Sequence, residues 1–193
     1  MECIAVFCGS SSGHDPEFEL QAALLGKKLA ANNIGLVYGG ARVGLMGAIA
    51  NAALKAGGKV TGIMPHFLKA KEIDHNGLTE FILVDTMHER KTRINELSDG
   101  FIVLPGGYGS MDEFFEILTW AQLGLHQKPV AVLNLKGYYD PLIQLVDNMV
   151  EKGFLKQVNR DMLLVDQTID NLMEKMRSYR PANVTKWITQ EKT

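Results

Sequence analysis

A glycine-rich segment at residues 105–110 carries the strongest chemical signal in the sequence. It reads Pro-Gly-Gly-Tyr-Gly-Ser and directly follows the apolar run Phe-Ile-Val-Leu at 101–104. Glycine permits a turn with positive φ and lets a ligand approach backbone N–H groups closely. Such N–H groups at the start of a helix suit a phosphate, so we expect a phosphate site here rather than an ordinary tight turn. The segment is not a P-loop, because no Gly-Lys-Ser/Thr follows. It is not the dinucleotide pattern either, because Asp112 replaces the third glycine.

Two further loops have related compositions. Residues 39–47 read Gly-Gly-Ala-Arg-Val-Gly-Leu-Met-Gly, and three serines follow Gly9. Taken alone, the first is equally well explained by close packing of a helix on a sheet, and the second by a polar turn or helix cap. Together with 105–110, the three loops indicate a phosphorylated small molecule.

Carboxylates cluster just after the glycine-rich segment. Asp112, Glu113 and Glu116 fall in the first turns of a helix predicted over 111–123. Ser110 as N-cap with Glu113 at N3 would form a capping box, which the sequence alone favours. The alternative is that Glu113 faces a ligand held by the glycine turn.

A charged run at 86–93 opens another predicted helix. Such a run is usually a solvated face. The alternative is that Arg90 uses the fixed fork of its guanidinium to bind a phosphate or a sugar hydroxyl.

Several other chemistries find no support. The five histidines lack metal-ligand spacing, and no G-x-S-x-G elbow occurs. Lys and Arg number 20 against 22 Asp and Glu, which disfavours nucleic-acid binding. No apolar stretch approaches the ~18 residues needed to span a membrane. We therefore expect no metal, no cofactor, no bound nucleic acid and no membrane association. The two cysteines resemble small core residues of a cytosolic protein, and the first residues do not form a signal peptide, so we expect a cytoplasmic location.

The elements that must position these residues alternate along the chain. Strands are predicted over 3–8, 35–38, 59–64, 80–84, 100–104, 130–134 and 163–165. Helices are predicted from residue 16 and over 44–56, 87–98, 111–123, 139–152 and 169–178. Residues 66–77 form an irregular stretch, long enough to border a site.

Alternating strands and helices with continuously apolar strands predict an α/β fold. We expect a doubly wound, Rossmann-like parallel sheet with helices on both faces, in one domain over 1–180 with a polar tail at 181–193. Ligands of such folds lie beyond the carboxyl ends of the strands. The three glycine-containing loops should therefore lie along one edge.

Residues 105–113, Pro-Gly-Gly-Tyr-Gly-Ser-Met-Asp-Glu, resemble the P-G-G-x-G-T-x-x-E signature of the Lonely Guy family. Residues 87–91 resemble its second motif, and 37–40 and the opening strand with 9–11 also fit. Its members are cytokinin riboside 5′-monophosphate phosphoribohydrolases, which split an N6-modified AMP into free base and ribose 5-phosphate. Many bacterial members have carried the label "possible lysine decarboxylase". That reaction needs a pyridoxal Schiff-base lysine, which nothing here marks.

The resemblance implies roles for individual residues. It makes Arg90 and Glu113 the catalytic pair. The implied substrate-binding positions also include Glu72, Lys91, Gly107, Tyr108, Gly109, Ser110, Met111, Asp112 and Thr119, with Ser11, Gly39, Gly40 and Met87 as additional candidates. The sequence departs from the family pattern at Ser110, which keeps the hydroxyl of the usual threonine, and at Ala41, where plant members often have glycine.

The implied chemistry agrees with these residue types. Cleavage of an N-glycosidic bond passes through an oxocarbenium-like state, which a carboxylate such as Glu113 can stabilise. Two alternatives remain: a non-catalytic nucleotide or molybdenum-cofactor carrier, and a general AMP nucleosidase. The presence of both Arg90 and Glu113 favours the enzyme, but no residue separates AMP from its N6-prenylated form.

The helix predicted over 111–123 is apolar around almost its whole circumference. One side of it should pack on the sheet, and the other would leave Phe and Trp side chains in water. We therefore predict a homodimer through this helix, as the resemblance also implies, with the active site near the interface.

Overall fold

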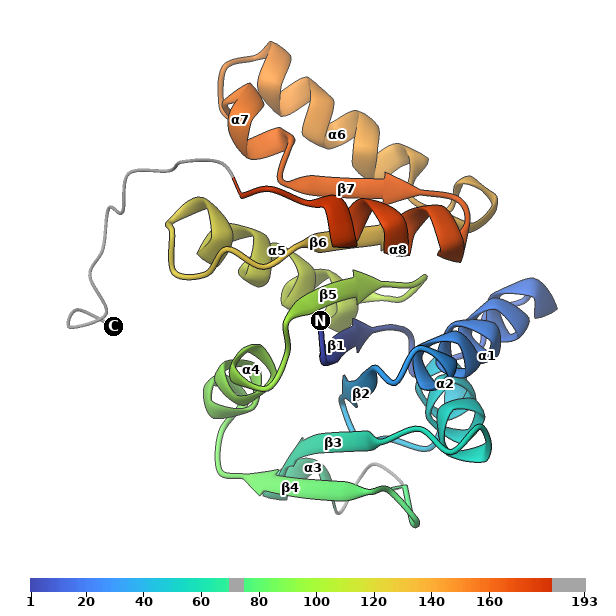
Figure 1. The fold of residues 1–193 in the computed structure, drawn as a ribbon. Helices are drawn as coiled ribbons and strands as arrows, with labels where there is room; N and C mark the ends of the chain where they lie inside the picture. Colours follow the sequence, from blue (N-terminus) through green and yellow to red (C-terminus); the bar gives the residue numbers. More distant parts are fainter. Residues whose placement is uncertain (70–74, 182–193) are drawn as a thin grey trace.

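The computed structural model describes residues 1–69 and 75–181. Within these ranges, seven strands form one sheet: β1 (Cys3–Phe7), β2 (Gly35–Tyr38), β3 (Val60–Pro65), β4 (Glu80–Val84), β5 (Gly100–Val103), β6 (Val130–Leu133) and β7 (Leu163–Asp166). The helices are α1 (Pro16–Ala31), α2 (Gly44–Lys55), α3 (His66–Lys69), α4 (Met87–Glu96), α5 (Tyr108–Gln122), α6 (Asp140–Glu151), α7 (Gln157–Arg160) and α8 (Ile169–Ser178). Figure 1 shows their arrangement.

All neighbouring strands are parallel, in the order β4-β3-β2-β1-β5-β6-β7. From β1 the chain winds outward through β2, β3 and β4, and it then returns to place β5 on the other side of β1. The direction of winding reverses between β1 and β5, so the loops that follow these two strands lead to α1 on one face of the sheet and to α5 on the other. Ligands of doubly wound folds bind in the crevice at such a point.

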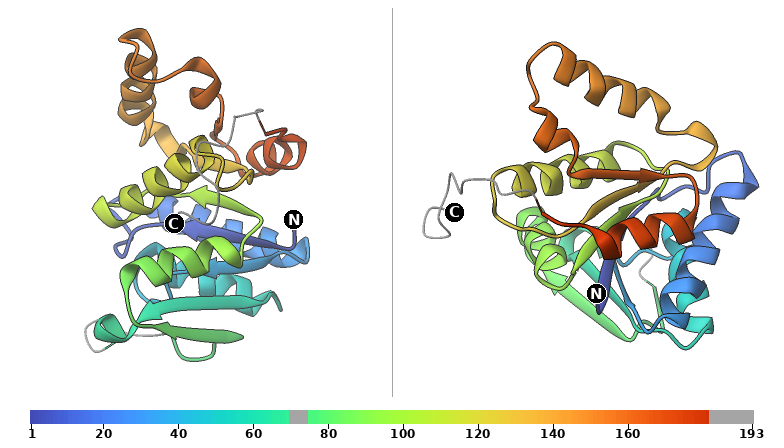
Figure 2. Two further views of the ribbon diagram at one scale, coloured as in Figure 1. Left: turned by 90° about the vertical axis from the view of Figure 1, so that its left-hand side faces the viewer. Right: turned by 45° about the horizontal axis from the view of Figure 1, so that its top comes forward.

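Helices cover both faces of the sheet, because successive strand residues point to opposite faces. Buried residues of α1, α2 and α8 pack on one face together with Ile4 and Val6 of β1. Phe114 and Ile117 of α5 and Ile94 of α4 pack on the other face. Figure 2 shows α6 and α7 beyond the β7 edge of the sheet. The predicted doubly wound α/β fold is confirmed.

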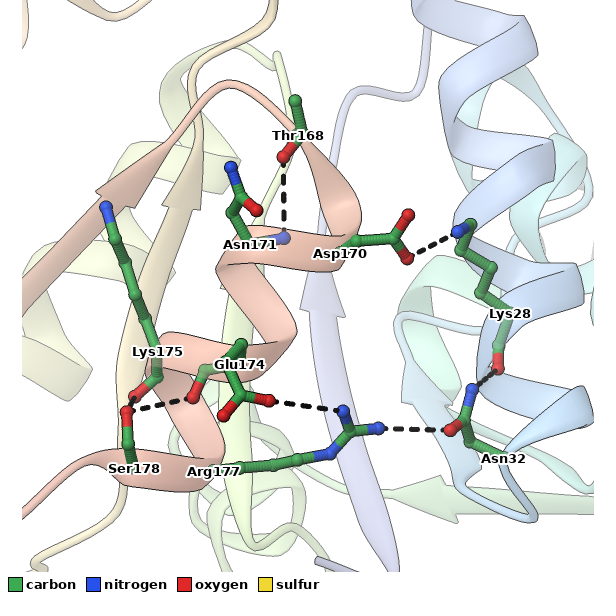
Figure 3. A network of polar contacts seen from close by, with 9 residues as sticks. All are labelled: Lys28, Asn32, Thr168, Asp170, Asn171, Glu174, Lys175, Arg177 and Ser178. Atoms are coloured by element: carbon green, nitrogen blue, oxygen red, sulfur yellow. Dashed lines mark hydrogen bonds and ion pairs between the residues drawn. The ribbon is translucent and has the colours of Figure 1, made fainter.

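Polar side chains join α8 to α1 on the first face. Lys28 pairs with Asp170, and Arg177 donates to Asn32 Oδ1 at 3.0 Å (Figure 3). These groups are largely exposed, with 78% of the Asp170 side chain accessible to solvent. They connect α8 to α1.

The predicted strands agree with the structure to within one or two residues, but the start of α5 differs. The helix begins at Tyr108, with Gly107 as N-cap, and not at Met111. Ser110 is therefore inside the first turn, where its side chain is buried. The predicted capping box of Ser110 and Glu113 is wrong, because the extended backbone of Gly107 starts the helix three residues earlier.

Two short α-helices and the 3-10 turn Leu135–Gly137 were not predicted from the sequence. The irregular stretch begins with α3, and α7 precedes β7. Among the described residues, no helix combines the length and apolar character needed to cross a membrane.

Candidate active site

The loops after β1, β2 and β5 meet at the carboxyl ends of their strands, as the sequence predicted. Gly9 donates its N–H to Pro105 O at 3.0 Å, and Leu45 donates its N–H to Gly9 O at 3.1 Å. These two bonds join all three loops through Gly9. Beside them lies a cavity of about 310 Å³, lined by Gly9, Ser10, Ser11, Ser12, Gly13, Phe18, Leu45, Pro105, Gly106, Gly107 and Tyr138.

The glycines of these loops have two different uses. A Cβ on Gly44 would collide with the backbone of Ser10, and one on Gly106 would collide with the side chain of Ser110, so both are needed for packing. A Cβ on Gly107 or Gly109 would meet none of the described atoms within 4 Å. Packing therefore does not account for these last two glycines, and their open surroundings allow a ligand to reach the start of α5.

Arg90 and Glu113 form a nearly buried ion pair beside these loops. Arg90 Nη1 lies 2.6 Å from Glu113 Oε1, and the two side chains are only 12% and 11% exposed. Arg90 Nε also donates to Ile63 O, within β3, at 3.1 Å. The structure thus brings together the two residues that the resemblance paired, from α4 and α5, across 23 positions of sequence.

Gly39 makes room for the arginine. A Cβ at this position would lie 2.5 Å from Arg90 Nη2 and 3.2 Å from Met46 Sδ. Any side chain at residue 39 would therefore push the guanidinium from its place. The structure places Gly39 against Arg90, and its neighbour Gly40 turns the chain with a φ of +83°.

Burial raises the pKa of Glu113, and the charges of Arg90 and Lys91 oppose only part of that rise. Burial thus favours the neutral form of this carboxyl group, and the charge of Arg90 favours the ionised form. Burial also raises the pKa of the Cys8 thiol, and the charge of Glu113 raises it further. Cys8 is therefore a protonated thiol near the pair and not a thiolate nucleophile.

Lys91 makes a second group of ion pairs next to the first. Its Nζ lies 2.8 Å from Asp112 Oδ2 and 3.2 Å from Glu116 Oε2, and its side chain is 11% exposed. Burial by itself lowers the pKa of Lys91, but the two carboxylates raise it overall, so the side chain stays charged.

The charged run at the start of α4 divides between two faces. His88, Glu89 and Arg93 are exposed, as a solvated face requires. Arg90 and Lys91 instead lie on the side of the helix that carries the buried Ile94, and both reach α5. The interpretation of the charged run as a solvated face is therefore wrong for Arg90 and Lys91. Met87, in the first turn of the helix, is half-buried.

The remaining predicted residues of α5 face another direction. Tyr108, Met111, Asp112 and Thr119 line a shallow hollow of about 590 Å³ on the outward side of the helix, with Phe115, Glu116 and Trp120. Thr119 Oγ1 donates to Phe115 O at 2.7 Å within the helix. In a single chain, Thr119 therefore does not share the cavity of Ser11 and Gly107.

One predicted substrate-binding residue, Glu72, lies outside the described ranges, and several contacts near the site were not predicted from the sequence. His75, just beyond that gap, donates its backbone N–H to Gly40 O at 3.2 Å. Phe18 and Tyr138 line the cavity with the glycine loops and were not predicted from the sequence. The motif Gly-Tyr-Tyr at 137–139 was the available signal for Tyr138, but no local pattern connects it to residue 106.

Metal binding finds no candidate within residues 1–69 and 75–181. No group of three or more His, Cys, Asp or Glu side chains lies close enough together there to hold a metal ion. The chemistry available at the site is that of a buried carboxylate, a guanidinium, an ammonium group and backbone N–H groups.

Comparison with known sequences finds close relatives. A family model described as "Possible lysine decarboxylase" matches residues 46–176. The chain is 44% identical over 178 residues to a probable cytokinin riboside 5′-monophosphate phosphoribohydrolase of Oryza sativa subsp. japonica, covering 92% of this chain and 73% of the relative. It is also 44% identical over 176 residues to the cytokinin riboside 5′-monophosphate phosphoribohydrolase of Rhodococcoides fascians, covering 91% and 89%.

Comparison with solved structures finds the same fold in more distant proteins. The molybdenum cofactor binding protein of Rippkaea orientalis aligns with a TM-score of 0.68 over 91% of this chain and 95% of that protein. The two are only 22% identical, so the likeness extends to the fold and not to the ligand.

Proposed function

The chain belongs to the Lonely Guy family, and from that premise we propose that it hydrolyses the N-glycosidic bond of an adenosine 5′-monophosphate, modified at N6 or not. The products are the free base and ribose 5-phosphate. The observation that carries the proposal is the nearly buried pair of Arg90 and Glu113, 2.6 Å apart beside the glycine loops.

The reaction breaks the bond between C1′ of the ribose and a ring nitrogen of the base. The electron pair of that bond leaves with the base, which takes up a proton, and a water molecule adds its hydroxyl to C1′. Positive charge develops on the ribose ring in between. A carboxylate held beside C1′ stabilises that charge and orients the water, and we assign this role to Glu113.

Arg90 has two tasks in this proposal. Its Nη1 favours the ionised form of Glu113, against the burial that raises the pKa of the carboxyl. Its bond to Ile63 O holds the guanidinium so that its remaining donors point in a set direction. A charged fork of fixed geometry suits a phosphate or a ribose hydroxyl.

The 5′-phosphate is assigned to the cavity between the loops after β1 and β5. Ser11 and Gly107 line it, and the first-turn N–H groups of α5 have no partner inside the helix. Glu113 lies about one helical turn after the buried Ser110. A nucleotide whose phosphate occupies the cavity would therefore have its ribose directed toward this carboxylate.

The functions that do not involve hydrolysis of a nucleotide find less support. A carrier that only binds a nucleotide or molybdenum cofactor has no need of a buried carboxylate paired with an arginine, and the likeness to such carriers is one of fold alone. The name "Possible lysine decarboxylase" implies pyridoxal chemistry, for which no residue of the site provides a Schiff-base lysine, because Lys91 is charged and paired with two carboxylates. A general AMP nucleosidase uses the same residues and differs only in the shape of the base pocket.

Two parallel incubations test the proposal. The purified protein is given AMP and isopentenyl-AMP in separate reactions, without added cofactor and with EDTA, and the release of base is followed by chromatography. Base release from either substrate, with ribose 5-phosphate in equal amount, is the expected result. Intact nucleotide in both reactions would overturn the assignment, and the ratio of the two rates separates a cytokinin-forming enzyme from a general nucleosidase.

We also propose that the chain forms a homodimer through the outward side of α5. Phe114 and Ile117 face the core, while Phe115 is 37% exposed and Tyr108 is 97% exposed. Together with the hollow of 590 Å³, these aromatic side chains form a patch of the kind that marks an interface. A partner over this hollow lies beside Asp112 and Glu116, the carboxylates that hold Lys91.

Light scattering at micromolar concentration tests the dimer. The expected mass is twice the 21.3 kDa of one chain. Phe115→Glu should yield monomers, whereas Leu20→Glu, which changes a 62% exposed residue of α1, should leave the mass unchanged. A mass near 21 kDa for the unmodified protein, with full activity, would refute the dimer.

A further inference from the structure

Tyr138 lines the cavity. It belongs to a segment of the chain that contributes no residue to the proposed catalytic pair. It follows the 3-10 turn Leu135–Gly137, between β6 and α6, and it lines the cavity with Ser11 and Gly107. Its hydroxyl donates to Gly106 O at 2.7 Å, across 32 positions of sequence. The ring is 45% exposed, so it borders the cavity and is not part of the core.

The acceptor of this hydrogen bond belongs to the peptide of segment 105–110 that joins two glycines. The peptide that joins Gly106 to Gly107 has no side chain on either neighbour, so both of its flanking residues have wide conformational freedom. The carbonyl and the N–H of a planar trans peptide point in opposite directions. A bond that fixes the carbonyl of Gly106 therefore also fixes the direction of the N–H of Gly107, at the entrance to α5.

The turn that carries Tyr138 is itself held firmly. Asn134 Oδ1 accepts the backbone N–H of Tyr139 at 2.8 Å, and its Nδ2 donates to Asp140 at 2.7 Å. Lys136 has a positive φ of 52° and pairs with Asp15 at 2.5 Å. Because Asp15 caps α1, this ion pair connects the Tyr138 turn to the loop after β1.

Aromatic contacts hold the ring of Tyr138 in place. Its centroid lies 5.9 Å from that of Phe18, which also lines the cavity, and 4.8 Å from that of Tyr139, both in edge-to-face geometry. Such pairs restrict the ring orientation. The hydroxyl therefore reaches Gly106 from a position that the fold sets in advance.

We propose that Tyr138 is a positioning residue that holds the Gly106–Gly107 peptide ready to bind the phosphate group of the substrate and of ribose 5-phosphate. The inference rests on the proposed function, since it takes the ligand of the cavity to be a sugar phosphate. It assigns Tyr138 to ground-state binding of the phosphate and not to the chemistry at C1′.

Tyr138→Phe tests this role, because the substitution removes the hydroxyl and keeps the ring against Phe18. The loss of one hydrogen bond of about 1 kcal/mol corresponds to a change of roughly fivefold in affinity. The dissociation constant of ribose 5-phosphate, measured by calorimetry, should rise by roughly that factor, as should KM for the nucleotide. The value of kcat and the affinity for free adenine, which has no phosphate, should stay within about twofold.

Tyr139→Phe is the matched control. Its hydroxyl donates to Leu104 O at the same distance of 2.7 Å, but Tyr139 is 2% exposed and does not line the cavity. It should lower thermal stability without changing the affinity for ribose 5-phosphate. Equal weakening by both substitutions would show a merely structural effect and overturn the inference.

The unmodified protein separates this inference from the proposed function. If it binds ribose 5-phosphate and Tyr138→Phe binds it equally well, the positioning role is wrong while the proposed function stands. If it binds neither ribose 5-phosphate nor AMP, the proposed function fails and this inference fails with it.

Discussion

Two ion pairs in this molecule each join a basic side chain to a carboxylate, but one pair is nearly buried and the other is largely exposed. Arg90 and Glu113 are 12% and 11% exposed, whereas Lys28 and Asp170 are 32% and 78% exposed (Figure 3). A buried pair has a large desolvation cost, and an exposed pair contributes little to stability. Burial also raises the pKa of Glu113, which an exposed carboxylate avoids. A fold retains such a costly pair where the charges perform a task, and the comparison therefore points to Arg90 and Glu113 as the functional pair.

The largest difference between the two pairs should appear in matched carboxylate-to-amide substitutions. Glu113→Gln keeps the size of the side chain but removes the charge that stabilises the ribose cation, so we expect kcat to fall by at least about a hundredfold. Asp170→Asn makes the same chemical change in the exposed pair and should leave kcat unchanged. Base release by chromatography measures both. Near-normal turnover in Glu113→Gln, with nucleotide binding intact, would remove the catalytic assignment.

Arg90→Ala should impair both binding and chemistry, and it should shift the pH profile. Burial raises the pKa of Glu113, and Arg90 opposes that rise, so loss of the arginine should raise the pKa further. Activity that needs the carboxylate declines as pH falls through this pKa. We therefore expect the acidic limb of kcat/KM to move to higher pH in Arg90→Ala, besides an overall loss of roughly a hundredfold.

An unmoved acidic limb in Arg90→Ala would mean that Glu113 does not control the profile. Arg93→Ala is the control, because Arg93 is an exposed arginine one turn along the same helix and pairs only with Glu96 in the described structure. It should leave both the rate and the profile unchanged.

Gly39→Ala should reduce activity through Arg90. The new Cβ would lie 2.5 Å from Arg90 Nη2, so the guanidinium must shift by about an ångström to restore an ordinary contact. Misplacement on that scale can cost about a hundredfold in rate. In the Arg90→Ala background the same substitution should have little further effect on kcat/KM. Additive losses would instead show that Gly39 acts independently of the arginine, for example by direct contact with the substrate.

The smallest effect is expected on the free energy of unfolding when the exposed pair of Lys28 and Asp170 is broken. Asp170→Asn removes the partner of Lys28, and the free energy of unfolding should fall by less than about 1 kcal/mol. Denaturant titration at low and high salt measures this, and the difference between the variants should shrink as salt screens the pair. A larger loss that salt does not reduce would mean that the contacts of α8 with α1 depend on this pair more than its exposure suggests.

Much of the fold was predictable from local patterns. Short apolar runs with glycine turns identified all seven strands, because buried parallel strands are continuously apolar and end at loops. The start of α5 was not predicted, since Ser110 is a better N-cap by residue type than Gly107. Its side chain is instead buried in the first turn, and a Cβ on Gly106 would collide with it. Local propensity gave way there to packing.

The sequence by itself determined the doubly wound sheet and the edge at which the glycine loops meet, because alternating periodicities and parallel strands leave few other topologies. It also contained Arg90 and Glu113 as candidates, but it favoured a solvated face for one and a helix cap for the other. Only the tertiary structure showed that Arg90 does not lie on a solvated face and that Glu113 does not cap the helix, by burying both side chains and placing them 2.6 Å apart. The hydrogen bond of Tyr138 to Gly106 likewise spans 32 positions. Contacts of this kind depend on how helices and loops from distant segments pack together, which no local pattern of residues encodes.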